Sequence, residues 1–311
     1  MAAPQRAVDL KPRAQGQDKA SSSSSKRFHP AFAALDADIV LESSDGELYR
    51  IHAYTLRSTS GFFRAMLSLP QPPGRRDATI QVHQPKDTVE QLLCLMCGLD
   101  MRPWHSYDDL AAVLALAEIW DTPGPIASLR AVVTNPKYLT TAPLDIYVLA
   151  VHFGWTVEAE LASTHTLTLN LSSPEHADTL ASLPAPALLA LLNLHRKRRD
   201  TLRTLLDSPA RFLAGNGNPF HCGTCAITPL DNTSWRALKH RVFREMDERP
   251  IGDGLGVPVG GICEWEEARA CWAAKCLKPG CGAVNYDRVA TLKQIKACVD
   301  GLPRVIQWDW D

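Results

Sequence analysis

The sequence predicts an α+β protein in which a small sheet near the N-terminus is followed by a longer helical part. Two observations lead to this fold class. Apolar runs at residues 39–41 and 48–51 flank the turn residues 43–46, Ser-Ser-Asp-Gly, which is the pattern of a β-hairpin. After His52, apolar residues recur at intervals near 3.6, which is the period of an α-helix. We therefore expect one hairpin that leads directly into helices.

The composition is that of a folded protein inside the cell. The 311 residues suffice for two domains, and a hydrophobic fraction of 45% supplies a core for each. No apolar run has the length of a membrane span or a secretory signal, so we expect the cytoplasm, the nucleus or both. Nine cysteines in a reducing compartment favour free thiols or metal ligands over disulfides. A net charge of −1 gives no overall attraction for nucleic acid or for a membrane surface.

Residues 1–30 are predicted to form a disordered tail. They contain several prolines and a run of five serines, and they hold too few large apolar side chains to offset the entropy lost on ordering. Six Lys or Arg face two Asp in this stretch. Such an excess of positive charge is typical of a solvated tail, with a role in localisation as the alternative.

Two short helices are expected after the hairpin. Leu56, Phe63 and Leu67 have helical spacing, and Ser58 or Ser60 offers an N-cap for the second helix. Residues 38–69 thus predict a compact unit in which a hairpin continues into a helix pair.

The same stretch resembles the start of the BTB/POZ domain, an α+β fold that binds other proteins. The expanded BTB family of mushroom-forming fungi is the most similar group. The likeness is strong over residues 38–69 and weaker afterwards. It is carried by Asp38 before the apolar run 39–41, by His52-Ala53, and by Leu56, Ser60, Phe62, Phe63 and Met66.

This resemblance implies a protein-interaction module that forms a homodimer or recruits protein partners. Family members serve as adaptors of cullin-type ubiquitin ligases or as transcriptional regulators, but the kelch repeats or tandem zinc fingers that accompany those roles are missing from this sequence. The segment Cys97–Trp104 also departs from the family pattern, so the identity of the partner does not carry over. The interaction residues that the resemblance implies are Asp38, His52, Tyr54, Leu56, Phe62 and Phe63.

The remaining patterns divide the chain into regions. Residues 79–82 alternate as a short strand, and apolar stripes through 89–96 and 110–117 predict two helices. Pro143 suits the first position of a further helix, and the longest periodic segment, at 188–206, predicts a helix of about five turns. Loops are expected at 69–76 and 214–219. The predicted order is a tail at 1–30, a BTB/POZ domain at 31–135, a helical extension at 136–213 and a helical, cysteine-containing region at 214–311.

Two features of the longest helix could each have a functional role or a purely structural one. His195 lies on the apolar stripe, where a hydrogen-bonded core histidine is the expected role rather than a ligand. The basic cluster 196–199 is expected to be the solvated face of the helix, with a nuclear-import signal as the alternative.

Four cysteines near the C-terminus are candidate metal ligands. Cys222 and Cys225 form a C-x2-C pair with a glycine inside, and Cys276 and Cys281 form a C-x4-C pair around Pro279-Gly280. Together they fit a structural zinc site, in which His221 could replace one thiolate. Two helices between the pairs would return the second pair to the first, and Cys276 is expected on the second helix, on a face with Trp265, Ala268 and Trp272.

Other roles for these cysteines stay open at this stage. Buried thiols without a metal also fit an apolar helix face, and a redox-active C-x2-C is a third interpretation, although no βαβ pattern surrounds it. The cysteines at positions without partner spacing are expected to fill the core: Cys94, Cys97, Cys263 and Cys298.

No pattern in the sequence indicates an enzyme. It lacks G-x-S-x-G, a phosphate-binding loop, H-E-x-x-H and paired carboxylates, and the glycines at 252–256 are expected to form a flexible loop. The functional alternative to a BTB interaction module is a zinc-stabilised C-terminal region that recognises protein or nucleic acid.

Overall fold

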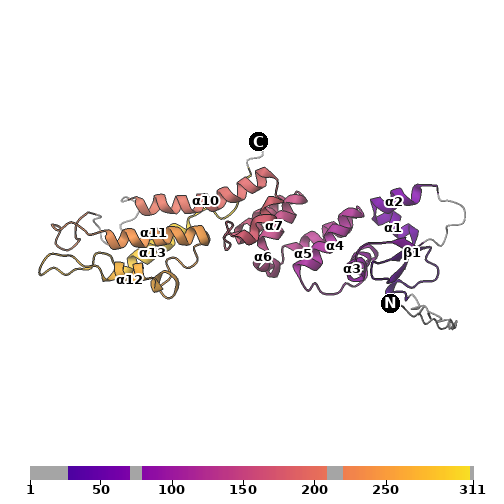
Figure 1. Cartoon of the computed structure of the whole chain (residues 1–311), viewed down its shortest axis with the longest axis horizontal. Helices are drawn as coiled ribbons and strands as arrows, with labels where there is room; N and C mark the ends of the chain where they lie inside the picture. The colour runs from indigo at the N-terminus through magenta and orange to yellow at the C-terminus, as the bar shows by residue number, and fades with distance from the viewer. Residues whose placement is uncertain (1–26, 71–78, 209–219, 309–311) are drawn as a thin grey trace, which may run out of the picture. The chain divides into compact units, whose positions relative to one another are not determined.

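The computed structural model describes residues 27–70, 79–208 and 220–308, and the chain forms two compact units, 1–127 and 128–311 (Figure 1). The fold class is α+β, with a small sheet in unit 1 and helices in both units. The loop predicted at 69–76, the boundary predicted at 214–219 and most of the tail predicted at 1–30 lie outside the described residues.

The predicted hairpin is confirmed. Strands β1 (Ile39–Glu42) and β2 (Leu48–Ile51) pair antiparallel in a register that sets Ile39 opposite Ile51. Gly46 has a φ of +86°, which glycine adopts without strain, and its amide donates to the Ser43 carbonyl at 3.0 Å. Asp45 in the same turn accepts from the amide of Lys86 at 2.9 Å. The hairpin turn therefore also holds the start of the next long helix.

The sheet has the order β2-β1-β3, because β3 (Ile80–Gln81) pairs parallel with β1. The short helix η1 (Pro30–Phe32) precedes the sheet, and α1 (Ala53–Thr59) and α2 (Gly61–Ser68) follow the hairpin. Ser60 is the N-cap of α2, as one of the two sequence candidates predicted: its Oγ accepts from the Phe63 amide at 3.1 Å and donates to the Trp120 carbonyl at 2.5 Å. One side chain thus starts a helix and fixes it to the chain sixty residues on.

Two longer helices complete the core of unit 1. They are α3 (Lys86–Cys97) and α4 (Tyr107–Ile119), the second of which begins with a capping box between Ser106 and Asp109. Helix α5 (Pro123–Val133) follows and crosses the boundary between the units. The core of unit 1 contains Leu41, Tyr49, Ile51, Leu56, Phe63, Val89, Leu92, Leu93, Leu110, Val113, Leu114 and Ala117.

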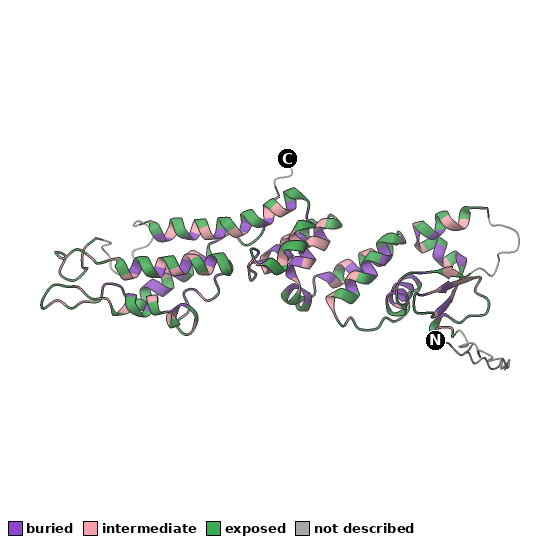
Figure 2. Ribbon diagram, viewed as in Figure 1, coloured by how far each residue is buried: buried purple, intermediate pink, exposed green. Residues whose placement is uncertain are grey.

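Unit 2 begins with short helices and one long helix. These are α6 (Pro136–Thr141), α7 (Pro143–His152), α8 (Thr156–Thr166), η2 (Pro174–His176), α9 (Ala177–Ala181) and α10 (Ala185–Asp207). Pro143 occupies the first turn of α7, as predicted. Figure 2 shows buried residues along one side of α10 and exposed residues along the other, the arrangement that its apolar stripe indicates.

Four helical segments lie on either side of the cysteines, and two of them pack against α10. They are α11 (Thr233–Glu248), η3 (Gly261–Glu264), α12 (Glu266–Ala273) and α13 (Arg288–Asp300). Helix α10 contacts both α11 and α13, and α11 contacts α12. The predicted helical extension and the predicted cysteine-containing region therefore share one core, which includes Leu202, Leu206, Trp235, Leu238, Val242, Met246, Ile262, Cys271 and Ile295.

Arg198 corrects the prediction of a solvated basic face. Its side chain is only 2% exposed, and its guanidinium donates to the carbonyls of Pro250 at 2.7 Å and Pro303 at 2.5 Å. These carbonyls follow the C-termini of α11 and α13, where backbone oxygens lack helical partners and the helix dipoles favour a cation. Burial lowers the pKa of Arg198 to about 10, so the side chain stays charged at neutral pH. Arg196 and Lys197 are exposed, as expected.

His195 has the structural role that the sequence predicted. Its Nε2 lies 3.2 Å from the Thr166 hydroxyl on α8, and burial lowers its pKa to about 4. It is therefore a neutral, hydrogen-bonded histidine at physiological pH. Within the described ranges, no helix combines the length and the apolar character needed to cross a membrane.

Candidate metal centre

The structure brings together the four cysteines that the sequence pairs as candidate ligands. Cys222 and Cys225 lie on a loop before α11, and Cys276 and Cys281 lie on a loop between α12 and α13. Their four sulfur atoms all lie within 4.8 Å of one another, with 3.8 Å between Cys222 and Cys281 and 3.9 Å between Cys225 and Cys276. The two loops thus contribute two sulfurs each to one centre.

The first loop is closed by backbone hydrogen bonds. The amide of Cys222 donates to the Thr228 carbonyl at 2.9 Å, and the amide of Ala226 donates to the Cys222 carbonyl at 2.8 Å. The second bond forces a tight turn, in which Ala226 adopts a φ of +56°, a conformation that favours glycine. This turn brings the sulfurs of Cys222 and Cys225 to the same centre.

The second loop reaches the same result with a longer spacing. The Cys281 amide donates to the Lys278 carbonyl at 3.0 Å, across a turn with Pro279 second and Gly280, at a φ of +80°, third. Proline and a positive-φ glycine at these positions are typical of a type II turn. The Cys276 amide donates to the Ala283 carbonyl at 2.8 Å, which closes the loop.

Cys276 does not lie on the helix where the sequence analysis expected it. Helix α12 ends at Ala273, and Lys275 pairs with Val284 in an antiparallel bridge. The helical pattern of Trp265, Ala268 and Trp272 therefore stops before Cys276. The reason is non-local, because the backbone groups that would extend the helix pair instead with the strand-like return of the loop.

The loops are held together by the segments that flank them. The Asn285 side-chain amide lies 3.5 Å from the Asp231 carbonyl, and the Tyr286 hydroxyl donates to the Asn232 side chain at the start of α11. The rings of Trp235 and Tyr286 are 5.5 Å apart. Two helices do return the second pair to the first, as predicted.

The sulfur spacing matches a tetrahedral centre of four thiolates. Zinc–sulfur bonds of about 2.3 Å in a tetrahedron set the sulfurs about 3.8 Å apart; two of the sulfur–sulfur distances here, on opposite edges, are 3.8 and 3.9 Å, and all lie within 4.8 Å. A disulfide requires about 2.05 Å. The four side chains can therefore hold a metal ion, and His221 is not in this group of ligand atoms among the described residues.

Three thiols of the centre differ in how readily they ionise. The Thr228 hydroxyl, 3.5 Å from Cys225 Sγ, and the amides of Ile227 and Thr228 lower the pKa of Cys225 to about 5. The amides of Cys225 and Thr224 lower the pKa of Cys222. For Cys281, a bond from the Ala283 backbone favours the thiolate, but burial and the neighbouring thiols outweigh it and raise the pKa to about 11. Thr228 was not among the predicted site residues, although its position three residues after Cys225 was an available signal.

The other cysteines lie outside this centre. Cys94 is buried on α3, which confirms its predicted core role, whereas Cys97 is exposed and contradicts that prediction. Cys97 is the last residue of α3, and the left-handed Gly98 that follows ends the buried stripe there. Cys263 and Cys298 are half-buried, and burial raises the pKa of the core thiol Cys271 to about 12.

The six residues implied by the BTB resemblance divide into three kinds. Leu56 and Phe63 are buried, whereas Tyr54 and Phe62 are 81% and 44% exposed. Asp38 accepts from the Ala53 amide at 2.7 Å and so caps α1, and His52 lies 3.8 Å from the carboxylate of Asp36. Leu56 and Phe63 therefore belong to the core, and of the six residues only Tyr54 and Phe62 expose large apolar side chains.

Comparison of the sequence with protein-family models gives no match, and comparison with curated proteins gives none either. The fold and the site together define an α+β protein with a four-cysteine centre that could hold a metal ion.

Proposed function

We propose that this protein is a non-catalytic, protein-binding adaptor whose second unit is stabilised by a structural zinc ion. The observation that carries the proposal is the convergence of four sulfur atoms within 4.8 Å, with two sulfur–sulfur distances that match the edge of a zinc–thiolate tetrahedron. Zinc suits this site because thiolate ligands in tetrahedral geometry favour it over harder cations.

The role of the ion would be structural. Four protein thiolates fill the coordination shell and leave no position for a water molecule or a substrate. Cys225 and Cys276 are 51 residues apart in the chain, so the ion would tie the loop before α11 to the loop after α12. Because the ligands converge only in the folded unit, the free energy of zinc binding would contribute to folding.

Metal analysis of the purified full-length protein tests this proposal. We expect about one equivalent of zinc per chain, lost in Cys222→Ser and retained in the control Cys298→Ser, whose thiol lies outside the centre. Less than about half an equivalent in the wild type, after refolding with excess zinc, would overturn the four-thiolate centre. Thiol titration with and without a chelator gives a second measure, because bound thiolates react slowly.

We infer a protein-binding role for unit 1 from its hairpin, its helix pair and the likeness of residues 38–69 to the BTB/POZ domain. Tyr54 on α1 and Phe62 on α2 are exposed, whereas Leu56 and Phe63 anchor the same two helices in the core, so the helix pair offers apolar area on a rigid base. We propose that this face supports a homodimer, or recruits a partner such as a cullin-type ubiquitin ligase.

Light scattering after size exclusion tests the dimer. We expect the wild type to have twice the mass of one chain at micromolar concentration and the double variant Tyr54→Glu/Phe62→Glu to be monomeric. Ala112→Glu, an exposed substitution on α4, is the matched control. A wild type that stays monomeric across the micromolar range would contradict dimerisation, and it would leave the zinc measurement unaffected.

A further inference from the structure

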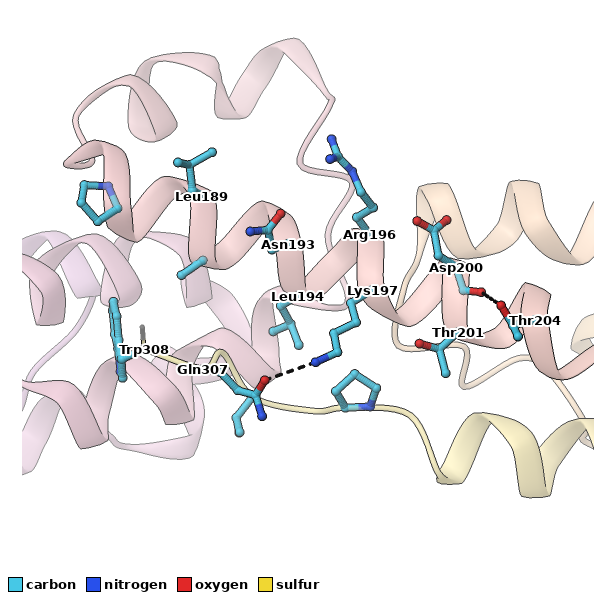
Figure 3. A pocket seen from close by; sticks show the side chains of 14 residues that line it. Leu189, Asn193, Leu194, Arg196, Lys197, Asp200, Thr201, Thr204, Gln307 and Trp308 are labelled. Carbon is cyan, nitrogen blue, oxygen red and sulfur yellow. Dashed lines mark hydrogen bonds between the residues drawn. The ribbon is translucent and has the colours of Figure 1, made fainter. Parts of the chain in front are cut away.

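A groove of about 740 Å³ runs along α10, between this helix and the segment 303–308 that follows α13 (Figure 3). Its lining on α10 extends from Pro186 to Thr204, which at 1.5 Å per residue is about 27 Å of helix. An extended peptide of about eight residues has this length. The groove is thus elongated and has the dimensions of a peptide site.

The groove carries positive charge that its own walls do not neutralise. Arg196 forms no ion pair with any residue in the described ranges, and Lys197 reaches only the neutral side chain of Gln307, at 3.2 Å. Figure 3 shows Lys197 directed toward Gln307 and Arg196 extending from the other edge of α10. The carboxylate that lines the groove, Asp200, is held by Arg199 at 2.8 Å. Two cations are therefore available to a ligand.

Part of the groove lining is apolar. Leu189 is 57% exposed and Val305 is 44% exposed, and both line it together with Pro186 and Trp308. The Trp308 ring lies parallel to that of Tyr147, with centroids 6.4 Å apart. Apolar area beside a cation pair favours a ligand with a large apolar side chain and a carboxylate.

Hydrogen bonds fix both walls. The Tyr147 hydroxyl donates to the Ala187 carbonyl at 2.8 Å, and the Ile306 amide donates to the Ser163 hydroxyl at 3.2 Å. Arg198, one residue beyond Lys197, binds the carbonyls of Leu302 and Pro303 and so ties the segment 303–308 to α10. A groove with rigid walls loses little conformational entropy when it binds.

We propose that this groove binds a short, extended peptide segment of a partner protein that carries at least one carboxylate and one large apolar side chain. Lys197 would hold the carboxylate, Arg196 on the other edge of α10 would add positive charge for a second acidic group, and Leu189 and Val305 would contact the apolar side chain. A nucleic acid fits less well, because two cations are few for a phosphate backbone and Asp200 would repel it. This site is separate from the face of Tyr54 and Phe62 and from the cysteine centre, so it depends on neither role proposed above.

An oriented library of octapeptides, presented to the immobilised full-length protein, tests the proposal. We expect enrichment of Asp and Glu at one or two positions and of Leu, Phe or Trp at another. Arg196→Glu/Lys197→Glu should remove the acidic preference and weaken binding of the best acidic peptide by at least about tenfold. Lys293→Glu, an exposed change of the same charge on α13, should preserve both. Leu189→Ser should remove the apolar preference alone.

Equal capture of acidic and basic peptides by the wild type would overturn the proposal, as would an acidic preference that survives the double charge reversal. Circular dichroism of each variant excludes unfolding as the cause of lost binding, and Arg196→Gln/Lys197→Gln repeats the test without charge reversal.

Two other occupants of the groove would give distinct results. A wild type that selects no peptide but associates with itself, with the association abolished in Arg196→Glu, would assign the groove to a second copy of the chain. If only a truncated chain that ends at Trp308 selects peptides, the groove would be assigned to residues 309–311 of this chain. Either result contradicts a partner peptide.

Discussion

Arg198 is expected to be the most sensitive charged side chain of unit 2, and Arg198→Met is the substitution that tests it. Methionine keeps most of the buried length but removes the donors that reach Pro250, Ile251 and Pro303 at 2.7, 3.0 and 2.5 Å. These three hydrogen bonds from a charged donor, counted without the longer one of 3.4 Å to the Leu302 carbonyl, contribute about 6 kcal/mol. The pKa of Arg198, lowered to about 10 by burial, corresponds to about 3 kcal/mol of unfavourable charge burial. The difference predicts a loss of about 3 kcal/mol in the free energy of unfolding.

Hydrogen–deuterium exchange in the full-length protein is the suitable assay. The chain has two units, so a single denaturation midpoint would combine their transitions, whereas exchange resolves α11 and α13. Arg198→Met should lower the opening free energy of both helices by about 3 kcal/mol, and Arg198→Lys by less, because a lysine reaches fewer carbonyls. Arg196→Met, an exposed change two residues away, should stay within about 0.5 kcal/mol of the wild type. Equal protection in Arg198→Met and Arg196→Met would refute the clamp.

Three further outcomes follow from the site and its surroundings. Removal of metal with a chelator at neutral pH should abolish exchange protection in residues 222–286 and leave unit 1 protected, and a pattern unchanged by the chelator would exclude a zinc contribution to this unit. Ala226→Gly should stabilise unit 2 by about 1 kcal/mol, because glycine relieves the positive φ, whereas the helical control Ala297→Gly should destabilise it by about 1 kcal/mol; a lower unfolding temperature of unit 2 in Ala226→Gly than in the wild type would disprove the strain at this position. His195, with a pKa of about 4 in the folded state, should make unit 2 less stable as pH falls from 6.5 to 4, by up to about 3 kcal/mol, and this contribution should be fully present above pH 6.5; the loss of stability between pH 6.5 and 4 should be smaller in His195→Gln by that amount, and an equal loss in both proteins would contradict the role of His195.

Features set by neighbouring residues could be predicted from the sequence. The hairpin at 39–51 and the Ser60 cap depend on a turn and on one helix start, both of which are local patterns. The four cysteines could be grouped because a C-x2-C loop and a proline–glycine turn each bring two sulfurs together. The end of α12 before Cys276 could not be predicted, because the pairing of Lys275 with Val284 that replaces the helix joins residues across a loop.

Burial of a charge was the other feature beyond the reach of sequence patterns. The carbonyls that accept from Arg198 lie 52 to 105 residues further along the chain, at the ends of two helices whose packing decides where those ends fall. No spacing rule within α10 carries that information. The groove could not be predicted from the sequence for the same reason, because its two walls, α10 and residues 303–308, are far apart along the chain.

The basic cluster 196–199 shows how helix geometry gives adjacent cations different roles. Successive residues of an α-helix are turned by about 100°, so Arg196 and Arg198 point about 200° apart. Arg198 faces the ends of α11 and α13 and binds their carbonyls, whereas Arg196 faces away from them and keeps its donors for a ligand. The clamp made by one arginine holds the segment 303–308 beside the helix that presents the other. Loss of Arg198 should therefore weaken peptide binding in the groove even though Arg196 and Lys197 remain, and unchanged binding in Arg198→Met would separate the clamp from the groove.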